Sequence, residues 1–95
     1  MTPSSMKALK AAIAKGPVSV AVQANQKVFL RYTGGVITAD CGTDIDHGVL
    51  AVGYGTTDDG IPYYKVKNSF GASWGEEGYV RIAMIEGDGM CGIQI

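Results

Sequence analysis

The sequence has little net charge and no long hydrophobic run. Its 8 Lys and Arg residues oppose 9 Asp and Glu residues, which leaves a formal net charge of −1. So small a charge excludes the strong electrostatic attraction on which binding to nucleic acid or to an anionic membrane depends. No apolar run approaches the roughly 18–20 residues that a membrane-spanning helix needs. The composition, 46% hydrophobic and 18% charged over 95 residues, is that of one globular domain or part of one.

Cysteine is also scarce. The two cysteines, Cys41 and Cys91, do not form a C-x-x-C pair, which argues against a zinc ribbon or a thioredoxin-like motif. A bridge between them would close a long loop, stabilise the fold by roughly 3–4.5 kcal/mol and imply an oxidising compartment. Two reduced, buried thiols are equally compatible with these residues alone.

The first part of the chain has the pattern of a helix followed by a strand. Apolar residues recur at helical spacing within residues 4–15, and Ser4 or Ser5 at the start can cap this helix. A Gly-Pro pair then ends it. Apolar and small residues alternate over 18–22, which predicts a strand. Asn25 is expected to cap a short helical turn that follows.

The remainder of the chain has the pattern of an antiparallel β unit. Aromatic and β-branched residues fill three predicted strands, over residues 48–54, 63–68 and 79–82. Residues 55–62 form a loop rich in Asp and Gly between the first two strands. A helix followed by antiparallel strands predicts an α+β fold.

Two features of the sequence could carry chemistry. His47, the single histidine, opens a predicted strand after a turn-rich segment, where a rigid scaffold can hold a reactive side chain within reach of a substrate. The alternative is a surface histidine beside Asp44 and Asp46. Residues 67–79 combine an amide, aromatic side chains and several glycines between two strands. Their alternative interpretation is a glycine-rich turn with a core tryptophan.

These two features resemble papain-like cysteine proteases. Residues 46–55 read DHGVLAVGYG and are similar to the histidine segment of that family, and residues 67–79 read KNSFGASWGEEGY and are similar to its asparagine segment. Residues 16–21 and 32–36 also match, so that the resemblance extends over about residues 7–95. It implies an α+β fold like the C-terminal half of papain, with one N-terminal helix and an antiparallel sheet or half-open barrel.

The resemblance also implies a Cys-His-Asn mechanism. His47 would hold a cysteine thiolate as an ion pair and then protonate the leaving amine, while Asn68 would orient the imidazole ring. Phe70 and Trp74 would cover the His47–Asn68 hydrogen bond and exclude water. Asp46 would lie beside the ion pair and tune its titration. The family usually has tryptophan at the position of Phe70, so this cover is expected to be thinner here.

Further residues take expected roles from the same resemblance. Cys41 and Cys91 match the structural disulfide of the family. Gly48, Val20 and Ala21 are expected in the walls of the substrate pocket, although Val20 and Ala21, within the predicted strand over 18–22, fit a plain core equally well. No metal and no cofactor is expected.

The resemblance places the nucleophile outside these residues. In this family the histidine lies roughly 130–150 residues after the catalytic cysteine, whereas only 46 residues precede His47. We therefore expect residues 1–95 to form a single domain, the sheet-rich C-terminal lobe, and the N-terminal lobe with the cysteine to be absent from it. The expected partners are that lobe, peptide or protein substrates, and cystatin-like inhibitors or an inhibitory propeptide, but neither nucleic acid nor membrane.

The expected function is therefore proteolysis, in a lysosomal, vacuolar or secreted location. Residues 1–5 do not have the charged-then-apolar plan of a signal peptide. One alternative is a non-catalytic lobe or pseudoprotease that acts as a binding module. A remote alternative is a zinc site made by Cys41, His47 and Cys91, whose spacing matches no known ligand pattern.

Overall fold

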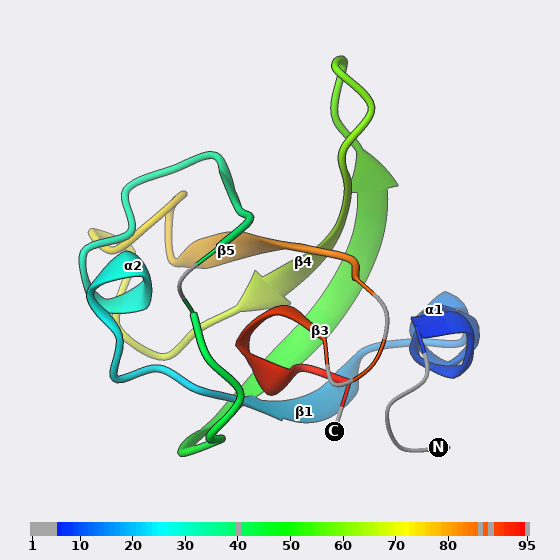
Figure 1. The fold of residues 1–95 in the computed structure, drawn as a ribbon, viewed down its shortest axis with the longest axis horizontal. Helices are drawn as coiled ribbons and strands as arrows, with labels where there is room; N and C mark the ends of the chain where they lie inside the picture. Colours follow the sequence, from blue (N-terminus) through cyan, green and yellow to red (C-terminus); the bar gives the residue numbers. More distant parts are fainter. Residues whose placement is uncertain (1–5, 40, 86, 88, 95) are drawn as a thin grey trace.

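A computed structural model describes residues 6–39, 41–85, 87 and 89–94 (Figure 1). Within these residues, two α-helices, five strands and a short 3₁₀ helix follow one another. In order they are α1 (Met6–Ala14), β1 (Val18–Val22), α2 (Lys27–Leu30), β2 (Val36–Ile37), β3 (His47–Thr56), β4 (Pro62–Lys67), β5 (Tyr79–Ala83) and η1 (Met90–Gly92).

Helix α1 ends at Ala14, one residue before the end that the sequence predicts. Leu9 and Ile13 are buried on one face of the helix, which packs against β3. Gly16, which has a φ of +147°, closes the last turn through a 3.0 Å hydrogen bond from its N–H to the carbonyl of Ile13. The expected cap at Ser4 or Ser5 lies outside the described residues.

The five strands form one sheet in the order β1-β3-β4-β5-β2. The first three pairs in this order are antiparallel, as expected, but β2 pairs with β5 in parallel. The sheet is therefore mixed, and the expectation of a wholly antiparallel sheet is wrong for this edge. A strand of two residues is too short to show alternation in the sequence, and only its contact with Arg81 and Ile82 defines it.

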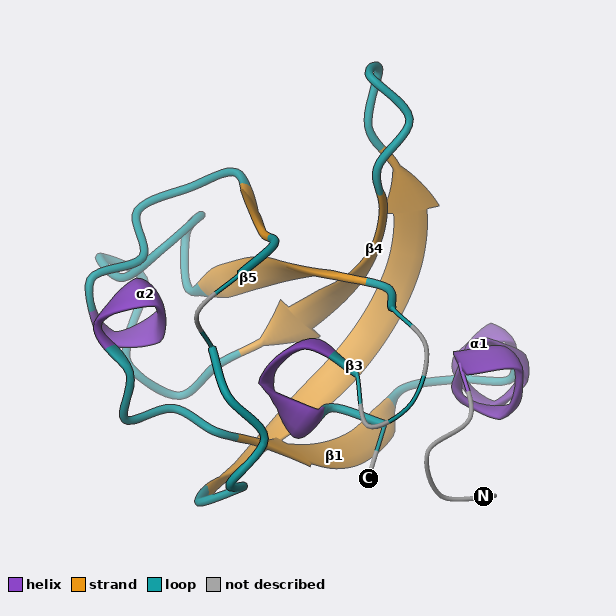
Figure 2. Cartoon of the chain, in the orientation of Figure 1, coloured by secondary structure: helices purple, strands orange, loops and turns teal. Residues whose placement is uncertain are grey.

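Helix α2 begins differently from the expectation. Gln26 is its N-cap residue, without a side-chain capping bond, and Asn25 is not the cap. The Asn25 side-chain oxygen instead accepts a 2.7 Å hydrogen bond from Gln23 Nε2. Figure 2 shows α1 and α2 on opposite sides of the strands, and Figure 1 shows the loop between β4 and β5 (yellow) beside α2.

The core lies on one face of the sheet and includes a disulfide. Strand residues that alternate along the chain point into this core, among them Val20, Val22, Val49, Ala51, Tyr64, Val66, Val80 and Ile82. The bond between Cys41 and Cys91 joins the segment before β3 to η1, and both residues are buried. The expected disulfide is confirmed. No helix in the described ranges is long and apolar enough to cross a membrane.

Candidate active site

His47 is the first residue of β3, and the residue before it fixes where this strand begins. The N–H of Asp46 donates to the carbonyl of Val22 at 3.0 Å, and Asp46 Oδ1 accepts a 2.8 Å hydrogen bond from the N–H of Ala24. Asp46 thereby ties the start of β3 to the end of β1. The sequence motif predicts that Asp46 tunes the titration of His47. The structure shows its carboxylate as the acceptor of a backbone hydrogen bond.

Asn68 follows the last residue of β4 and meets His47. Its side-chain Oδ1 lies 2.7 Å from His47 Nε2 and also accepts a 2.9 Å hydrogen bond from the N–H of Ser69. The backbone N–H of Asn68 donates to the carbonyl of Gly78 at 3.0 Å, which anchors the end of the strand. The structure therefore brings together the two residues that the sequence motifs singled out.

These contacts decide which imidazole nitrogen carries the proton. The Ser69 N–H can only donate, so the Asn68 group that faces it must be the oxygen rather than the NH₂ group. An amide oxygen has no proton to give, so Nε2 of His47 is the protonated nitrogen. In the neutral ring Nδ1 is then left free to accept a proton. The amide nitrogen of Asn68 is buried and has no hydrogen-bond partner within the described part of the chain.

Aromatic rings pack around the His47 ring of this pair. The Phe70 ring lies 5.2 Å from the His47 ring, centroid to centroid, at an interplanar angle of 30°. Trp74 packs against Phe70 at 5.3 Å and against Phe29 at 5.1 Å, and its Nε1–H donates to the carbonyl of Phe29 at 3.1 Å. Phe70 is 41% exposed, so its ring is open to solvent on one side.

Phe29 is the site residue that sequence reasoning missed. This fully buried ring lies 6.5 Å from His47 in an edge-to-face arrangement and also contacts Phe70 at 6.0 Å. The pattern of apolar residues around α2 indicates a core position for it. Nothing in the local sequence links it to a histidine 18 positions later, because the link is made by the tertiary fold.

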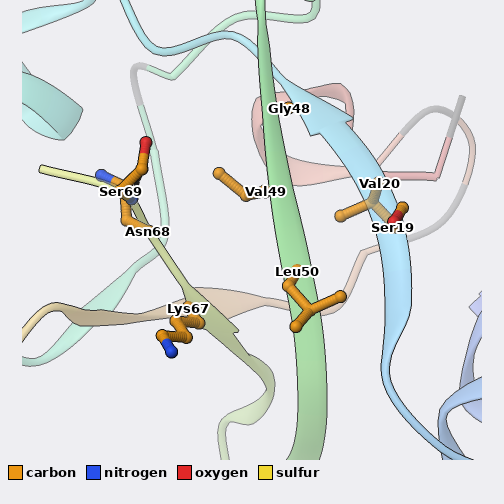
Figure 3. Close-up of a pocket in the computed structure, with 8 residues that line it drawn as sticks. All are labelled: Ser19, Val20, Gly48, Val49, Leu50, Lys67, Asn68 and Ser69. Carbon is orange, nitrogen blue, oxygen red and sulfur yellow. Dashed lines mark hydrogen bonds between the residues drawn. The ribbon is translucent and has the colours of Figure 1, made fainter.

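An open groove of about 460 Å³ runs beside Asn68. Figure 3 shows Val49 and Leu50 of β3 between the β1 residues on one side and the end of β4 on the other. The residues that line the groove are Ser19, Val20, Gly48, Val49, Leu50, Lys67, Asn68 and Ser69. Gly48 and Val20 therefore line it, whereas Ala21, which pairs with Gly48 across the two strands, does not.

The zinc alternative does not fit the site. The sulfur atoms of Cys41 and Cys91 are bonded to each other, so neither is a thiolate that could bind a metal with His47. Within the described ranges, no group of three or more His, Cys, Asp or Glu residues could hold a metal ion.

The family model described as "Papain family cysteine protease" matches residues 1–95. The chain belongs to the papain family of cysteine proteases. The expected α+β papain-like fold is thereby confirmed, with a mixed rather than wholly antiparallel sheet.

Several plant proteases of the papain family are similar in sequence. Cysteine proteinase EP-B 1 of Hordeum vulgare is 55% identical over 87 residues, which are 90% of this chain and 24% of that protein. Vignain of Ricinus communis is 52% identical over 88 residues, with the same coverage. The chain thus spans about a quarter of the length of these relatives.

Solved papain-family structures superpose closely on the chain. Bromelain from Ananas comosus, in complex with the E64 inhibitor, has a TM-score of 0.93 and 43% identity over 98% of this chain and 44% of that one. The proform of the ragweed pollen allergen Amb a 11 has a TM-score of 0.95 and 39% identity over 98% of this chain and 26% of that one.

Proposed function

We propose that the chain supplies the histidine and asparagine of a papain-type peptidase active site. The observation that carries this proposal is the bond between His47 Nε2 and Asn68 Oδ1, whose direction is set by the Ser69 N–H. This arrangement leaves Nδ1 as the nitrogen that can accept a proton from a cysteine thiol. The thiolate and the imidazolium then form the ion pair that a cysteine peptidase needs.

In this proposal His47 acts twice. It first takes the thiol proton at Nδ1, and the thiolate attacks the scissile carbonyl of a peptide. The same proton then passes from Nδ1 to the leaving amine, so that the peptide bond breaks and an acyl-enzyme remains. Asn68 keeps its bond to the Nε2 proton in both protonation states and so holds the ring in one orientation. The aromatic cover over this bond excludes water, which strengthens it.

The nucleophilic cysteine is proposed to come from another part of the protease. Both cysteines of the 95 residues are used in the disulfide, so neither can attack a substrate. We therefore propose that residues 1–95 are the C-terminal lobe, that an N-terminal lobe is its partner, and that this chain alone does not cleave peptide bonds.

The groove is the proposed substrate-binding wall. Most of the residues that line it belong to β1 and β3, and it stays open at Gly48 because no side chain projects there. Peptide and protein substrates, cystatin-like inhibitors and an inhibitory propeptide are the proposed ligands. Support comes from bromelain, which was solved with an inhibitor, and from Amb a 11, which was solved as a proform. A vacuolar, lysosomal or secreted location fits the disulfide.

The test is a chimeric protease. Residues 1–95 would replace the matching segment of cysteine proteinase EP-B 1, and hydrolysis of a fluorogenic dipeptide substrate would be measured under reducing, mildly acidic conditions. We expect activity in the chimera and its loss in His47→Ala, because the thiolate loses its counter-ion and the amine its acid. Asp58→Ala, at an exposed loop residue, is the control and should retain activity. Near-full activity of His47→Ala would mean that the lobe acts as a binding module instead.

A further inference from the structure

The loop between β4 and β5 carries three residues of the proposed site, Asn68, Phe70 and Trp74, on an unusual backbone. Glu77 has a φ of +56° and Gly78 a φ of +90° in the turn that ends the loop. Glu76 and Tyr79 close this turn with two backbone hydrogen bonds of 2.9 and 3.1 Å, as in a type I′ hairpin. A left-handed conformation at a glutamate is unfavourable, so other interactions must hold the loop in place.

The carboxylate of Glu76 makes three of these interactions. Its Oε1 accepts a hydrogen bond from Arg81 Nε, and its Oε2 accepts one from Arg81 Nη2, both at 2.9 Å. Oε2 also accepts a 3.1 Å bond from the backbone N–H of Gly35, on the segment that leads into β2. A two-point Arg–carboxylate pair fixes geometry as well as charge. The pair with Arg81 therefore joins the loop to β5, and the third bond joins it to the segment around Gly35.

Tyr32, which follows α2, also connects the loop to its neighbours. Its hydroxyl donates to the carbonyl of Gly35 at 2.6 Å and accepts a 3.3 Å bond from the N–H of Arg81. Its carbonyl accepts a 3.2 Å bond from the N–H of Gly75, and its ring packs 5.3 Å from Trp74. A Cβ at Gly75 would lie 2.8 Å from the Tyr32 ring, so only glycine permits this approach.

The pKa shifts of Glu76 and Tyr32 favour the protonation states that these hydrogen bonds need. The hydrogen bonds from Arg81 hold the pKa of Glu76 below its ordinary value, so the carboxylate keeps its charge to a lower pH than an ordinary glutamate does. Burial raises the pKa of Tyr32, so its hydroxyl keeps the proton that it donates to Gly35. We call Glu76, Arg81, Tyr32 and Gly35 the Glu76 clamp.

We propose that Glu76 is a positioning residue for the active site, and that the Glu76 clamp keeps Phe70 and Trp74 closed over the His47–Asn68 hydrogen bond. Glu76 itself does not touch His47 or Asn68. It acts through the loop, in which Trp74, two residues before Glu76, packs against Phe29 and Tyr32. The inference rests on the proposed function for the roles of His47 and Asn68, but the closure of the loop can be measured without any peptidase activity.

The experiment uses the 95-residue chain, which contains one histidine and one tryptophan. In the ¹⁵N-labelled protein, NMR would follow exchange of the His47 Nε2 proton with water. Loss of a partly buried two-point ion pair in Glu76→Gln is expected to speed this exchange about five- to tenfold through local opening of the loop. Amide exchange in β3 and β4 should stay unchanged, because the sheet itself is not altered.

Glu77→Gln is the matched control, because it removes the same charge from the adjacent residue. Glu77 is exposed, and its side chain has no hydrogen-bond partner among the described residues. Equal exchange rates in Glu76→Gln and in wild type, or in Glu76→Gln and Glu77→Gln, would overturn the proposal. So would an equal acceleration at the sheet amides, because it would mean that Glu76 only stabilises the fold.

A second variant keeps the proposal testable if Glu76→Gln does not fold. Arg81→Lys retains the positive charge but cannot make the two-point pair, so it should give a smaller acceleration together with a shift in Trp74 emission. A wild-type exchange rate and unshifted emission in Arg81→Lys would contradict the clamp. In the chimeric protease, Glu76→Gln should lower kcat with little change in KM. An inactive chimera would instead count against the proposed function, and leave the NMR result standing.

Discussion

Replacement of Asn68 by alanine should separate stability from activity. The change removes Oδ1, so the His47 Nε2–H and the Ser69 N–H both lose their acceptor. Each of these hydrogen bonds contributes about 1 kcal/mol to folding. The change also removes Nδ2, a buried donor without a partner in the described residues, whose burial costs about 1–3 kcal/mol. The two effects oppose each other, so the free energy of unfolding should change by no more than about 1 kcal/mol.

Activity should respond much more strongly. Without the amide oxygen the imidazole ring can rotate away from the position in which, in the proposed mechanism, Nδ1 faces the thiol. A misplaced catalytic group typically costs up to about a hundredfold in rate. In the chimeric protease we therefore expect Asn68→Ala to lower kcat by about ten- to a hundredfold, which is a smaller loss than for His47→Ala.

A second buried amide provides the matched comparison. Both polar atoms of the Gln94 side chain have a partner, because Tyr64 Oη–H donates to its Oε1 at 2.8 Å and its Nε2 donates to the carbonyl of Gly87 at 3.0 Å. Gln94→Ala relieves no unsatisfied donor and leaves a cavity, so it should destabilise the chain by about 2–4 kcal/mol. Urea unfolding followed by far-UV circular dichroism compares the two variants. If Asn68→Ala is destabilised as much as Gln94→Ala, the reasoning about Nδ2 is wrong.

Four further predictions follow from the same structure. Gly48→Val should fold with an unchanged melting temperature, because a Cβ at this position meets no atom within 4 Å. In the chimera it should raise KM, because the new side chain fills the groove. A lower melting temperature would contradict this. Glu77→Asn should stabilise the chain by about 0.5–1 kcal/mol in urea unfolding, because asparagine tolerates a positive φ better, and a loss of stability would count against the type I′ turn. Because the pKa of Glu76 is lower in the folded state than the ordinary glutamate value of 4.5, the charged carboxylate stabilises the fold above pH 4.5. This stability is lost as the pH falls through the folded-state pKa. Thermal melts of Glu76→Gln should therefore depend less on pH in this acid range than those of wild type. Phe70→Trp should leave chimera activity equal or higher, because a larger ring restores the cover over Asn68, and a clear decrease would mean that Phe70 fits this loop better.

The sequence predicted the elements that have strong local patterns. The helix ends before the Gly-Pro pair, and β1 covers the residues that alternate. β3 extends beyond its predicted bounds at both ends, from His47 to Thr56, because backbone pairing with its neighbours continues where the side-chain alternation does not. β2 could not be predicted, because its two residues are defined only by a neighbour more than 40 positions away.

The candidate site was partly predictable for a similar reason. His47 and Asn68 stand in long motifs, and the structure brings them within 2.7 Å of each other. Phe29 and the bonds of the Glu76 clamp join segments that are remote in sequence, so no local pattern indicates them. Asn25 has the chemistry of a helix cap, but Gln23 uses its oxygen. The type of a residue therefore predicted which hydrogen bonds its side chain can form, whereas the tertiary fold determined its partner.

The buried disulfide has a practical consequence for labelling. Because Cys41 and Cys91 are bonded to each other and shielded from solvent, the chain offers no thiol to a maleimide or iodoacetamide reagent. A cysteine introduced at Ser19, an exposed residue on the groove, would then be the only position that such a reagent modifies. A fluorophore attached there would report directly on whatever enters the groove, without any need to remove native cysteines first.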